Sequence, residues 1–138
     1  MTRADWAFLH DTAVGLAALL SNTDSFNNTA VGSCALQGND STAAATANNN
    51  TAVGSRALRD NINAGRNTAV GSLALQKNDN TGNGTATDNT AVGVQALFGN
   101  TDGGSNTAVG RFALQANTSG SNNTALGAHA WQCRLDRQ

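Results

Sequence analysis

The sequence lacks proline, tyrosine and glutamate entirely, and Lys77 is its single lysine. Only 12% of its 138 residues are charged and only 4% are aromatic. Helical bundles and coiled coils are rich in Glu, Lys, Leu and Arg, so this composition disfavours both classes. A net charge of −1 offers no basic surface for nucleic acid or for an anionic membrane. No segment reaches the roughly 18 apolar residues of a membrane helix, so we expect no direct membrane insertion.

One motif is repeated along nearly the whole chain. The string Thr-Ala-Val-Gly-x-x-Ala-Leu occurs six times, and a seventh copy reads Thr-Ala-Leu-Gly-Ala-His-Ala-Trp. The copies begin at Thr12, Thr29, Thr51, Thr68, Thr90, Thr107 and Thr124, so successive starts are 17, 22, 17, 22, 17 and 17 residues apart. Such self-similarity indicates a repeat architecture. We predict one domain over residues 1–138, with an N-terminal cap at 1–10, seven repeats at 11–131 and a C-terminal tail at 132–138.

The repeat length and the residue alternation favour short strands. A unit of 17 residues is too short for a helical hairpin, which needs more than about 30. Thr-Ala-Val alternates as a strand does, with Thr and Val on one face and Ala on the other. We expect a second short strand over x-x-Ala-Leu, followed by an Asn-rich turn. Stacked coils of this kind form an all-β parallel β-solenoid that rises about 4.8 Å per coil.

Three columns of equivalent residues follow from this stacking. The first is a buried repeat core of Val14, Val31, Val53, Val70, Val92, Val109 and Leu126. The second is a set of turn glycines, where a Cβ would obstruct a sharp bend: Gly15, Gly32, Gly54, Gly71, Gly93, Gly110 and Gly127. The third is a stripe of small residues opposite Val, which would pack either within the wall of the roll or against neighbouring chains: Ala13, Ala30, Ala52, Ala69, Ala91, Ala108 and Ala125. Each coil has so few large apolar side chains that we expect self-association to supply stability.

A column of asparagines precedes the motif. Asp11 stands before the first copy, and the later copies follow Asn28, Asn50, Asn67, Asn89, Asn106 and Asn123. Stacked in register, these side chains predict a ladder that is hydrogen-bonded from coil to coil. Calcium binding at residues 78–83 or 100–104 is the alternative, but neither segment has the distal Glu of an EF-hand loop.

The motif Asn-Thr-Ala-Val-Gly-x-x-Ala-Leu resembles the head repeats of YadA-like trimeric autotransporter adhesins. It is also similar to the Asn-Thr-Ala-Val-Gly repeats of phage tail fibres and of surface proteins that end in an endosialidase-type chaperone. The resemblance covers residues 11–131 and implies a left-handed parallel β-roll of about seven coils, assembled as a homotrimer. It also implies a location at the cell surface, as an outer-membrane adhesin, or in a phage virion as part of a tail fibre. The repeats here are longer than those of the adhesin heads.

The two 22-residue repeats carry long loops at residues 38–50 and 77–89, at equivalent places two copies apart. We expect them to project from the same side of the array, and loops on a rigid scaffold often carry binding residues. The candidate receptor contacts are Asn39, Asp40, Thr42, Asn78, Asp79 and Asn83. Because the loops are mostly uncharged and lack aromatic rings, a purely decorative role is the alternative.

The remaining reactive side chains are too scattered for catalysis. His10 and His129 lie near opposite ends of the array, and they cannot share a site within one chain. Cys34 and Cys133 are about five coils apart, beyond the ~7 Å Cα separation that a disulfide allows. We predict no enzymatic activity, no cofactor and no metal. The bulky Trp6 and Trp131 are expected to cover the two terminal coils.

The sequence supports three hypotheses about function. The first is a non-enzymatic trimeric attachment module that binds a surface receptor, such as a matrix protein or a glycan, by multivalency. The second is a rigid spacer within a longer fibre, and a binding assay on this chain would discriminate the two. The third is an ice-binding solenoid, although its single Thr column shares a face with Val; a thermal hysteresis assay would test it.

Overall fold

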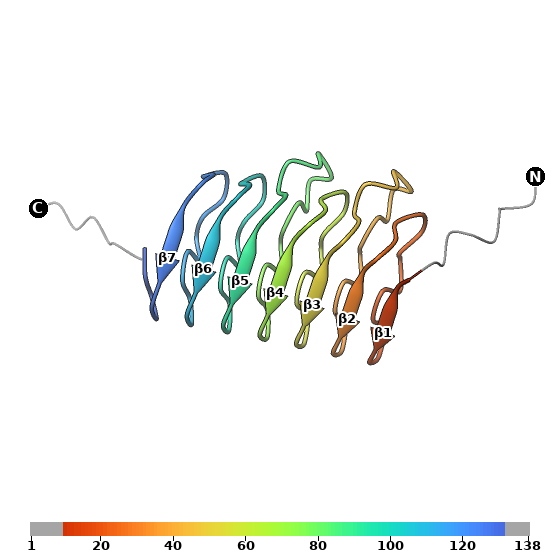
Figure 1. Cartoon of the computed structure of the whole chain (residues 1–138), viewed down its shortest axis with the longest axis horizontal. Helices are drawn as coiled ribbons and strands as arrows, with labels where there is room; N and C mark the ends of the chain where they lie inside the picture. The colour runs from red at the N-terminus through yellow and green to blue at the C-terminus, as the bar shows by residue number, and fades with distance from the viewer. Residues whose placement is uncertain (1–9, 132–138) are drawn as a thin grey trace, which may run out of the picture.

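The structure is a computed structural model that describes residues 10–131, so most of the predicted cap, the predicted tail, Trp6 and Cys133 lie outside the described part. The described chain contains no helix and folds into a single sheet of seven parallel strands in sequence order (Figure 1). The strands are β1 (Thr12–Val14), β2 (Thr29–Val31), β3 (Thr51–Val53), β4 (Thr68–Val70), β5 (Thr90–Val92), β6 (Thr107–Val109) and β7 (Thr124–Leu126). This all-β arrangement is that of a parallel β-solenoid.

Each copy of the motif forms one strand, and the strands pair in register. Thr pairs with Thr, Ala with Ala and Val with Val along the sheet, and Val109 pairs with Leu126. We call the residues from one motif Thr to the next a coil, numbered 1 to 7 from Thr12. The amide of Gly54 donates to the Val31 carbonyl of the preceding coil at 2.8 Å. The same bonds recur between neighbouring coils, so each coil is held by those adjacent to it.

The interior is lined by the motif alanines and leucines, not by valine. In the central copies the strand Ala has no exposed surface, and neither do the Ala and the Leu that follow the bend. In coil 4 these residues are Ala69, Ala74 and Leu75, and they belong to the same core cluster. The Val side chains lie outside, with Val31, Val53, Val70 and Val92 37–39% exposed and the terminal Val14 and Leu126 more so. The predicted buried column of Val14, Val31, Val53, Val70, Val92, Val109 and Leu126 is therefore wrong for the single chain.

The inverted faces have a steric reason. Alternation in Thr-Ala-Val establishes that Ala and Val point in opposite directions, but it does not say which direction is inward. Because Leu already fills the narrow interior from the opposite wall, only a methyl group fits across from it. Of the two predicted places for the Ala stripe, the structure therefore shows packing inside one chain and not against neighbouring chains.

The x-x-Ala-Leu segment forms turns, and the predicted second strand is absent from coils 1 to 7 as described. Its second x residue and its Leu both have left-handed backbones, with φ of 57° at Arg56 and 50° at Leu58. Left-handed conformations cost roughly 1–2 kcal/mol per non-glycine residue. They persist here because the neighbouring coils hold the amides: Arg56 donates to the Ser33 carbonyl and Leu58 to the Ala74 carbonyl.

The glycine after each strand allows the coils to approach closely. The seven motif glycines have φ between 120° and 135°. A Cβ on Gly54 would lie 2.6 Å from the carbonyl carbon and oxygen of Gly71 in the next coil. A side chain at this position is therefore excluded by the backbone of the neighbouring coil.

Two columns of asparagine run through the interior. The predicted ladder is confirmed, but its side-chain oxygens accept backbone amides: Asn50 N donates to Asn28 Oδ1 and Asn67 N to Asn50 Oδ1, each at 2.9 Å. A second ladder is bonded from side chain to side chain, with Nδ2 of each residue on Oδ1 of the one before at 2.7–2.9 Å. Its members are Asn22, Asn39, Asn61, Asn78, Asn100 and Asn117. Both ladders satisfy polar groups in the interior.

Candidate binding surfaces

The two long coils, coil 2 and coil 4, raise their loops at the same edge of the stack, as expected (Figure 1). A buried aspartate holds each loop by its backbone. Asp40 Oδ1 accepts the amides of Ala44 and Ala45 at 2.9 and 3.1 Å, and its Oδ2 accepts the amide of Asp24 at 2.9 Å. Both oxygens are therefore used to fix the loop on the preceding coil.

Asp79 has the equivalent role in coil 4. Its Oδ1 accepts the amide of Gly84 at 2.9 Å, and its Oδ2 accepts the amide of Asn63 at 2.7 Å. Burial raises the pKa of the Asp79 carboxyl above its ordinary value; these amide donors oppose the rise, and the nearby charge of Asp102 adds to it. The loop is thus anchored by a carboxylate whose charge is partly desolvated.

The two loops are joined through Asn63 of the intervening coil 3. Thr42 Oγ1 donates to Asn63 Oδ1, and Asn63 Nδ2 donates to the Gly82 carbonyl, each at 2.6 Å. The network continues into coil 5, where Asn83 Nδ2 donates to Asp102 Oδ1 at 2.6 Å. We call these five residues, Thr42, Asn63, Gly82, Asn83 and Asp102, the loop ridge. It links four successive coils through hydrogen bonds.

Only two of the six predicted receptor contacts are at the surface. Asn39, Asp40, Asn78 and Asp79 have no exposed surface, so their prediction as contacts is wrong. The asparagines belong to the second ladder and the aspartates to the loop anchors, which explains their burial. Thr42 and Asn83 are exposed.

Sequence reasoning missed the connecting role of Asn63 and the second ladder. The ladder had a readable signal, since each of its members stands three residues after the motif Leu whatever the loop length. The Asn-Asp pairs at 39–40 and 78–79 likewise occur only in the two long coils. Nothing in the pattern marked Asn63, whose contacts depend on both neighbouring loops.

Each long coil leaves one buried amide unpartnered. Ala64 of coil 3 accepts Asn50 Nδ2 from the preceding coil at 3.0 Å. Ala47 of coil 2 instead accepts Asn39 and Asn50 of its own coil. Among the described residues, Asn28 Nδ2 and Asn67 Nδ2 are buried without a partner, and they lie in the coils directly before the two long ones. An unpaired buried donor costs about 1–3 kcal/mol, so the inserted loops reduce stability locally.

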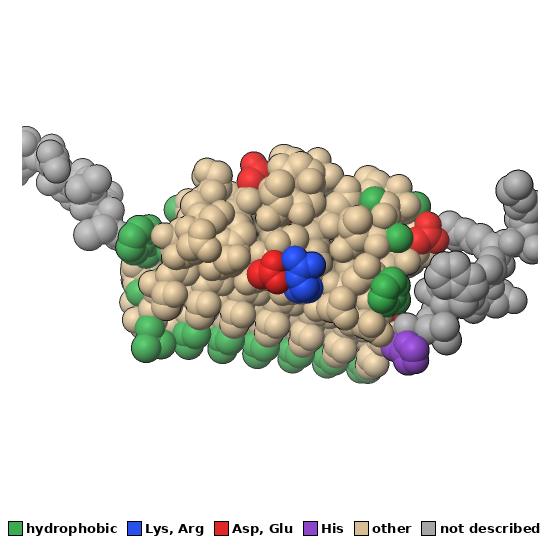
Figure 2. All heavy atoms as spheres, turned by 45° about the horizontal axis from the view of Figure 1, so that its top comes forward, with side chains coloured by type: hydrophobic (Ala, Val, Ile, Leu, Met, Phe, Trp, Pro, Cys, Tyr) green, Lys and Arg blue, Asp and Glu red, His purple; other side chains and the backbone are tan. Residues whose placement is uncertain are grey.

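The outer face of the sheet forms a second candidate surface, which we call the Thr–Val face. It consists of the Thr and Val columns of β1 to β7. The apolar side chains form a row along one edge of the molecule (Figure 2), away from the long loops (Figure 1). Leu16 and Val94, each just after a motif glycine, add exposed apolar surface of 80% and 44%. Extended exposed apolar surface of this kind is typical of an interaction site.

The charged and aromatic contacts among the described residues are few and lie far apart. Arg66 forms a bidentate ion pair with Asp88 at 2.7 and 2.8 Å, which lowers the pKa of Asp88. Near the C-terminal end the Arg111 guanidinium lies 4.2 Å from the Phe112 ring centroid, and the His129 ring lies 4.9 Å from it. These contacts support neighbouring coils and are too dispersed to form a pocket.

No chemistry-bearing cluster emerges within residues 10–131. That part of the chain contains no group of three or more His, Cys, Asp or Glu residues able to hold a metal ion. Cys34 is a free, half-buried thiol, and Cys133 lies outside the described residues. None of the described residues forms a helix that could cross a membrane.

The comparisons with known proteins add no relative. No family model, no curated protein and no solved structure matches this chain. The indications of function are therefore the two surfaces, the loop ridge and the Thr–Val face, together with the resemblance of the repeat motif.

Proposed function

We propose that the chain is a non-enzymatic attachment module that works as a parallel homotrimer of left-handed β-rolls. Its location would be a cell surface or a phage virion, and its partner a surface receptor such as a matrix protein or a glycan. The stoichiometry, the handedness and the location come from the resemblance of the Asn-Thr-Ala-Val-Gly repeats to adhesin heads and tail fibres. The observation that supports association most directly is the exposed Val row of the Thr–Val face.

The Thr–Val face is the association surface in this proposal. It contains no charged residue in any strand, and its Val column continues through the whole stack. Parallel chains in axial register would place equal residues at equal heights, so each Val would meet its counterparts. Covering this row would stabilise the assembly by about 25 cal/mol for each Å² of apolar surface removed from water. The thin interior of one chain cannot supply this stabilisation by itself.

The loop ridge is the receptor surface in this proposal. It lies away from the Thr–Val face, so association leaves it accessible. Three copies in a trimer would present three equal ridges, and several weak contacts made together give avidity. The buried anchors Asp40 and Asp79 hold the loops in place before binding, which lowers the entropic cost of recognition.

A rigid spacer is the second candidate function, and one observation favours it. The amide of Asn83 and the hydroxyl of Thr42 already donate to partners within the chain. A ridge with its polar groups satisfied internally has less to offer a ligand. Binding of the chain to immobilised matrix proteins, to glycans and to host cells separates the candidates, because a spacer binds none of them.

The association surface can be tested with Val70→Asp. Analytical ultracentrifugation of the wild-type chain should give a trimer at micromolar concentration. Three buried carboxylates at one height would repel one another, so Val70→Asp should abolish the trimer. Asn80→Asp, which adds the same charge to an exposed loop, is the matched control and should remain trimeric. A wild-type monomer, or a trimeric Val70→Asp, would contradict the proposal.

A further inference from the structure

The charged residues are divided between two sides of the stack. The net charge of −1 is an average over the whole chain and does not show this division. The residues between each motif glycine and the next asparagine of the second ladder form the side opposite the sheet, and we call their outer surface the turn wall. Of the five cationic residues within residues 10–131, the turn wall carries four: Arg56, Arg59, Lys77 and Arg111. Of the seven acidic residues in that range, it carries only Asp60.

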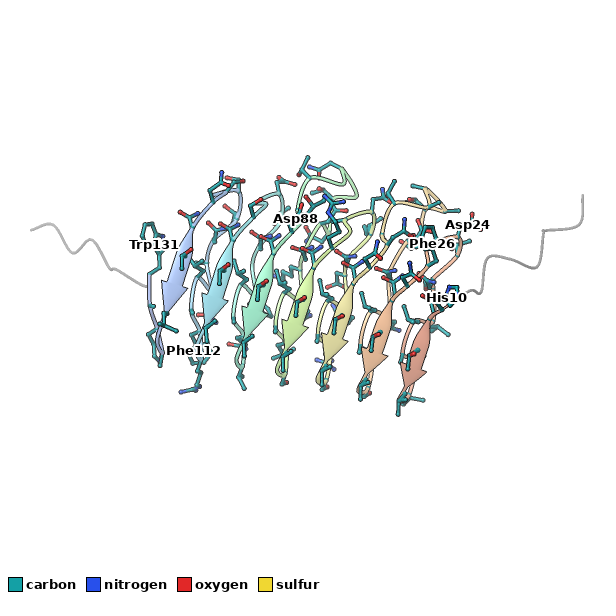
Figure 3. All side chains as sticks on the ribbon, in the orientation of Figure 1. His10, Asp24, Phe26, Asp88, Phe112 and Trp131 are labelled. Atoms are coloured by element: carbon teal, nitrogen blue, oxygen red, sulfur yellow. The ribbon has the colours of Figure 1, made fainter. Side chains whose placement is uncertain are left out.

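The other acidic residues lie on the side of the loops. Figure 3 shows Asp24 and Asp88 at the edge of the stack that carries the long loops, and Phe112 of the turn wall at the opposite edge. Arg66, the remaining cation of the described range, is also on the loop side and is paired with Asp88. The loop side is therefore acidic and the turn wall basic.

Three of the four turn-wall cations have no acidic partner. Asp60 compensates Arg59 in a bidentate pair, with both N–O distances at 2.8 Å. No ion pair within residues 10–131 includes Arg56, Lys77 or Arg111, and all three side chains are exposed. Exposed cations of this kind create a local positive potential, even though the whole chain is slightly negative.

Two of these cations lie against aromatic rings of the same wall. Lys77 Nζ is 5.3 Å from the centroid of the Phe98 ring, and the guanidinium carbon of Arg111 is 4.2 Å from that of Phe112. Such cation–π contacts hold a long side chain near the wall without neutralising its charge. Because each ring already has a cation on it, the rings are poorly placed to stack on the bases of a nucleic acid.

The turn wall is continuous from coil to coil. Gln115 follows the Leu of coil 6, and its Nε2 donates at 2.8 Å to Oε1 of Gln95, which precedes the Ala-Leu pair of coil 5. Arg56, Lys77 and Arg111 belong to coils 3, 4 and 6, so at about 4.8 Å per coil they span about 14 Å along the stack. Cations spaced this widely suit an extended polyanion better than a small anion.

We propose that the turn wall binds an acidic polysaccharide, a chain of sugars that carries carboxylate or sulfate groups. Arg56, Lys77 and Arg111 pair with these groups through charge-assisted hydrogen bonds. The half-buried amides of Gln37 and Gln95 lie on the same wall and suit the hydroxyl groups of the sugars. This site goes beyond the proposed function, in which the loop ridge is the receptor surface. Because the wall lies opposite the Thr–Val face, it does not depend on association of the chain.

The test measures binding of the full chain to immobilised polysaccharides by biolayer interferometry. Heparin presents sulfate groups and polygalacturonate presents carboxylates, so the stronger of the two identifies the preferred anionic group. We expect at least one of them to bind, with an affinity that falls as NaCl is added. Neutral dextran should not bind.

Replacing the three cations with glutamine should remove the site. Gln95 already occupies the motif position of Arg56 with the same left-handed backbone, at φ of 58° and 57°, so the change is compatible with the fold. The triple variant Arg56→Gln, Lys77→Gln, Arg111→Gln should lose at least about tenfold in affinity. Circular dichroism melts verify that it is folded.

Two single variants form a matched pair, because Lys77→Gln and Arg66→Gln each remove one positive charge. Only Lys77→Gln should weaken binding, and Thr42→Ala in the loop ridge should bind as the wild type does. Four results would overturn the proposal: no binding of either acidic polysaccharide, undiminished binding by a folded triple variant, equal losses in the matched pair, or a loss in Thr42→Ala. Tighter binding of oligo(dT) or of polyglutamate would also overturn it, since the partner would then be a nucleic acid or an acidic protein segment.

Discussion

The motif glycine is the residue on which close stacking most directly depends. Its positive φ and the backbone 2.6 Å from its absent Cβ are two separate constraints, one conformational and one steric. Interior glycines are subject to both. Gly127 is subject to the conformational constraint alone, so the chain contains its own control for separating them.

Gly71→Ala should therefore destabilise the protein more than Gly127→Ala. A Cβ on Gly71 would lie 2.7 Å from the Gly93 carbonyl group, and overpacking of this kind costs about 1–3 kcal/mol. The strain of an alanine at positive φ is common to both variants and cancels in the comparison. Circular dichroism melts should show Gly71→Ala unfolding roughly 5–10 °C below Gly127→Ala. Equal melting temperatures would mean that the coils can separate without loss of stability.

Asp79 should make the stability of the protein depend on acidity. Burial raises its pKa above the ordinary 3.8, so the folded chain binds this proton more tightly than the unfolded chain. Its contribution to folding is therefore greatest below pH 3.8 and is lost as the pH rises through the raised pKa. Urea unfolding from about pH 3 to pH 7 should show the wild type losing stability relative to Asp79→Asn as the pH increases.

Asp88 provides the opposite control for that titration. Its hydrogen bonds to Arg66 lower its pKa, so its contribution is present above pH 3.8 and is lost as the pH falls through the lowered value. Asp88→Asn should accordingly change the pH dependence in the other direction. Parallel profiles for the wild type and Asp79→Asn would contradict the role assigned to Asp79.

Among the elements, the two long coils are the ones that depart from the regular repeat. Each has a buried aspartate anchor and an unpartnered amide in the preceding coil, Asn28 before coil 2 and Asn67 before coil 4. A 17-residue coil such as coil 3 has no unpartnered amide in the coil before it. The insertions therefore leave one buried amide without a hydrogen bond in each case. Such a local loss of stability is expected where a segment serves a purpose other than stability.

Shortening coil 2 should recover that loss. Deleting residues 41–45 gives coil 2 the length of coil 3, and Asp40→Thr removes the carboxylate whose Ala44 and Ala45 donors disappear. Ala47 could then accept Asn28 Nδ2 as Ala64 accepts Asn50 Nδ2, a gain of up to about 1–3 kcal/mol. The shortened chain should melt at or above the wild-type temperature. The deletion without Asp40→Thr should be less stable, and a marked loss in the double variant would refute this explanation.

The elements also show how far the sequence could be read. The motif period predicted the number of coils, the strand positions and the first asparagine ladder, because each depends only on repetition and alternation. It could not decide whether Val70 or Ala69 faces inward, since alternation is symmetric and the outcome depends on the space left by Leu75. It also placed Asn39 and Asp40 at the surface, because polar residues in a loop are usually solvated. The interior of this coil is polar on its ladder side, which reverses that expectation.

On the scale of the whole molecule, the surfaces are separated and each can be removed by itself. The Thr–Val face and the loop ridge occupy different parts of one rigid stack. Val70→Asp and deletion of residues 41–45 therefore address association and receptor binding independently. A repeat protein permits this because each coil interacts only with its neighbours, so local changes have local effects.

The alternation of short and long coils has a mechanical consequence. The strands lie across the stack, so tension applied between the two ends of the chain peels coils away singly instead of shearing the whole sheet. An extended chain spans at most about 3.3–3.6 Å per residue. A 17-residue coil then releases about 56–61 Å of chain and a 22-residue coil about 73–79 Å. A fibre built from such modules would lengthen under load in steps of two sizes. The five inserted residues of each long coil would then add extensible chain in addition to forming a loop.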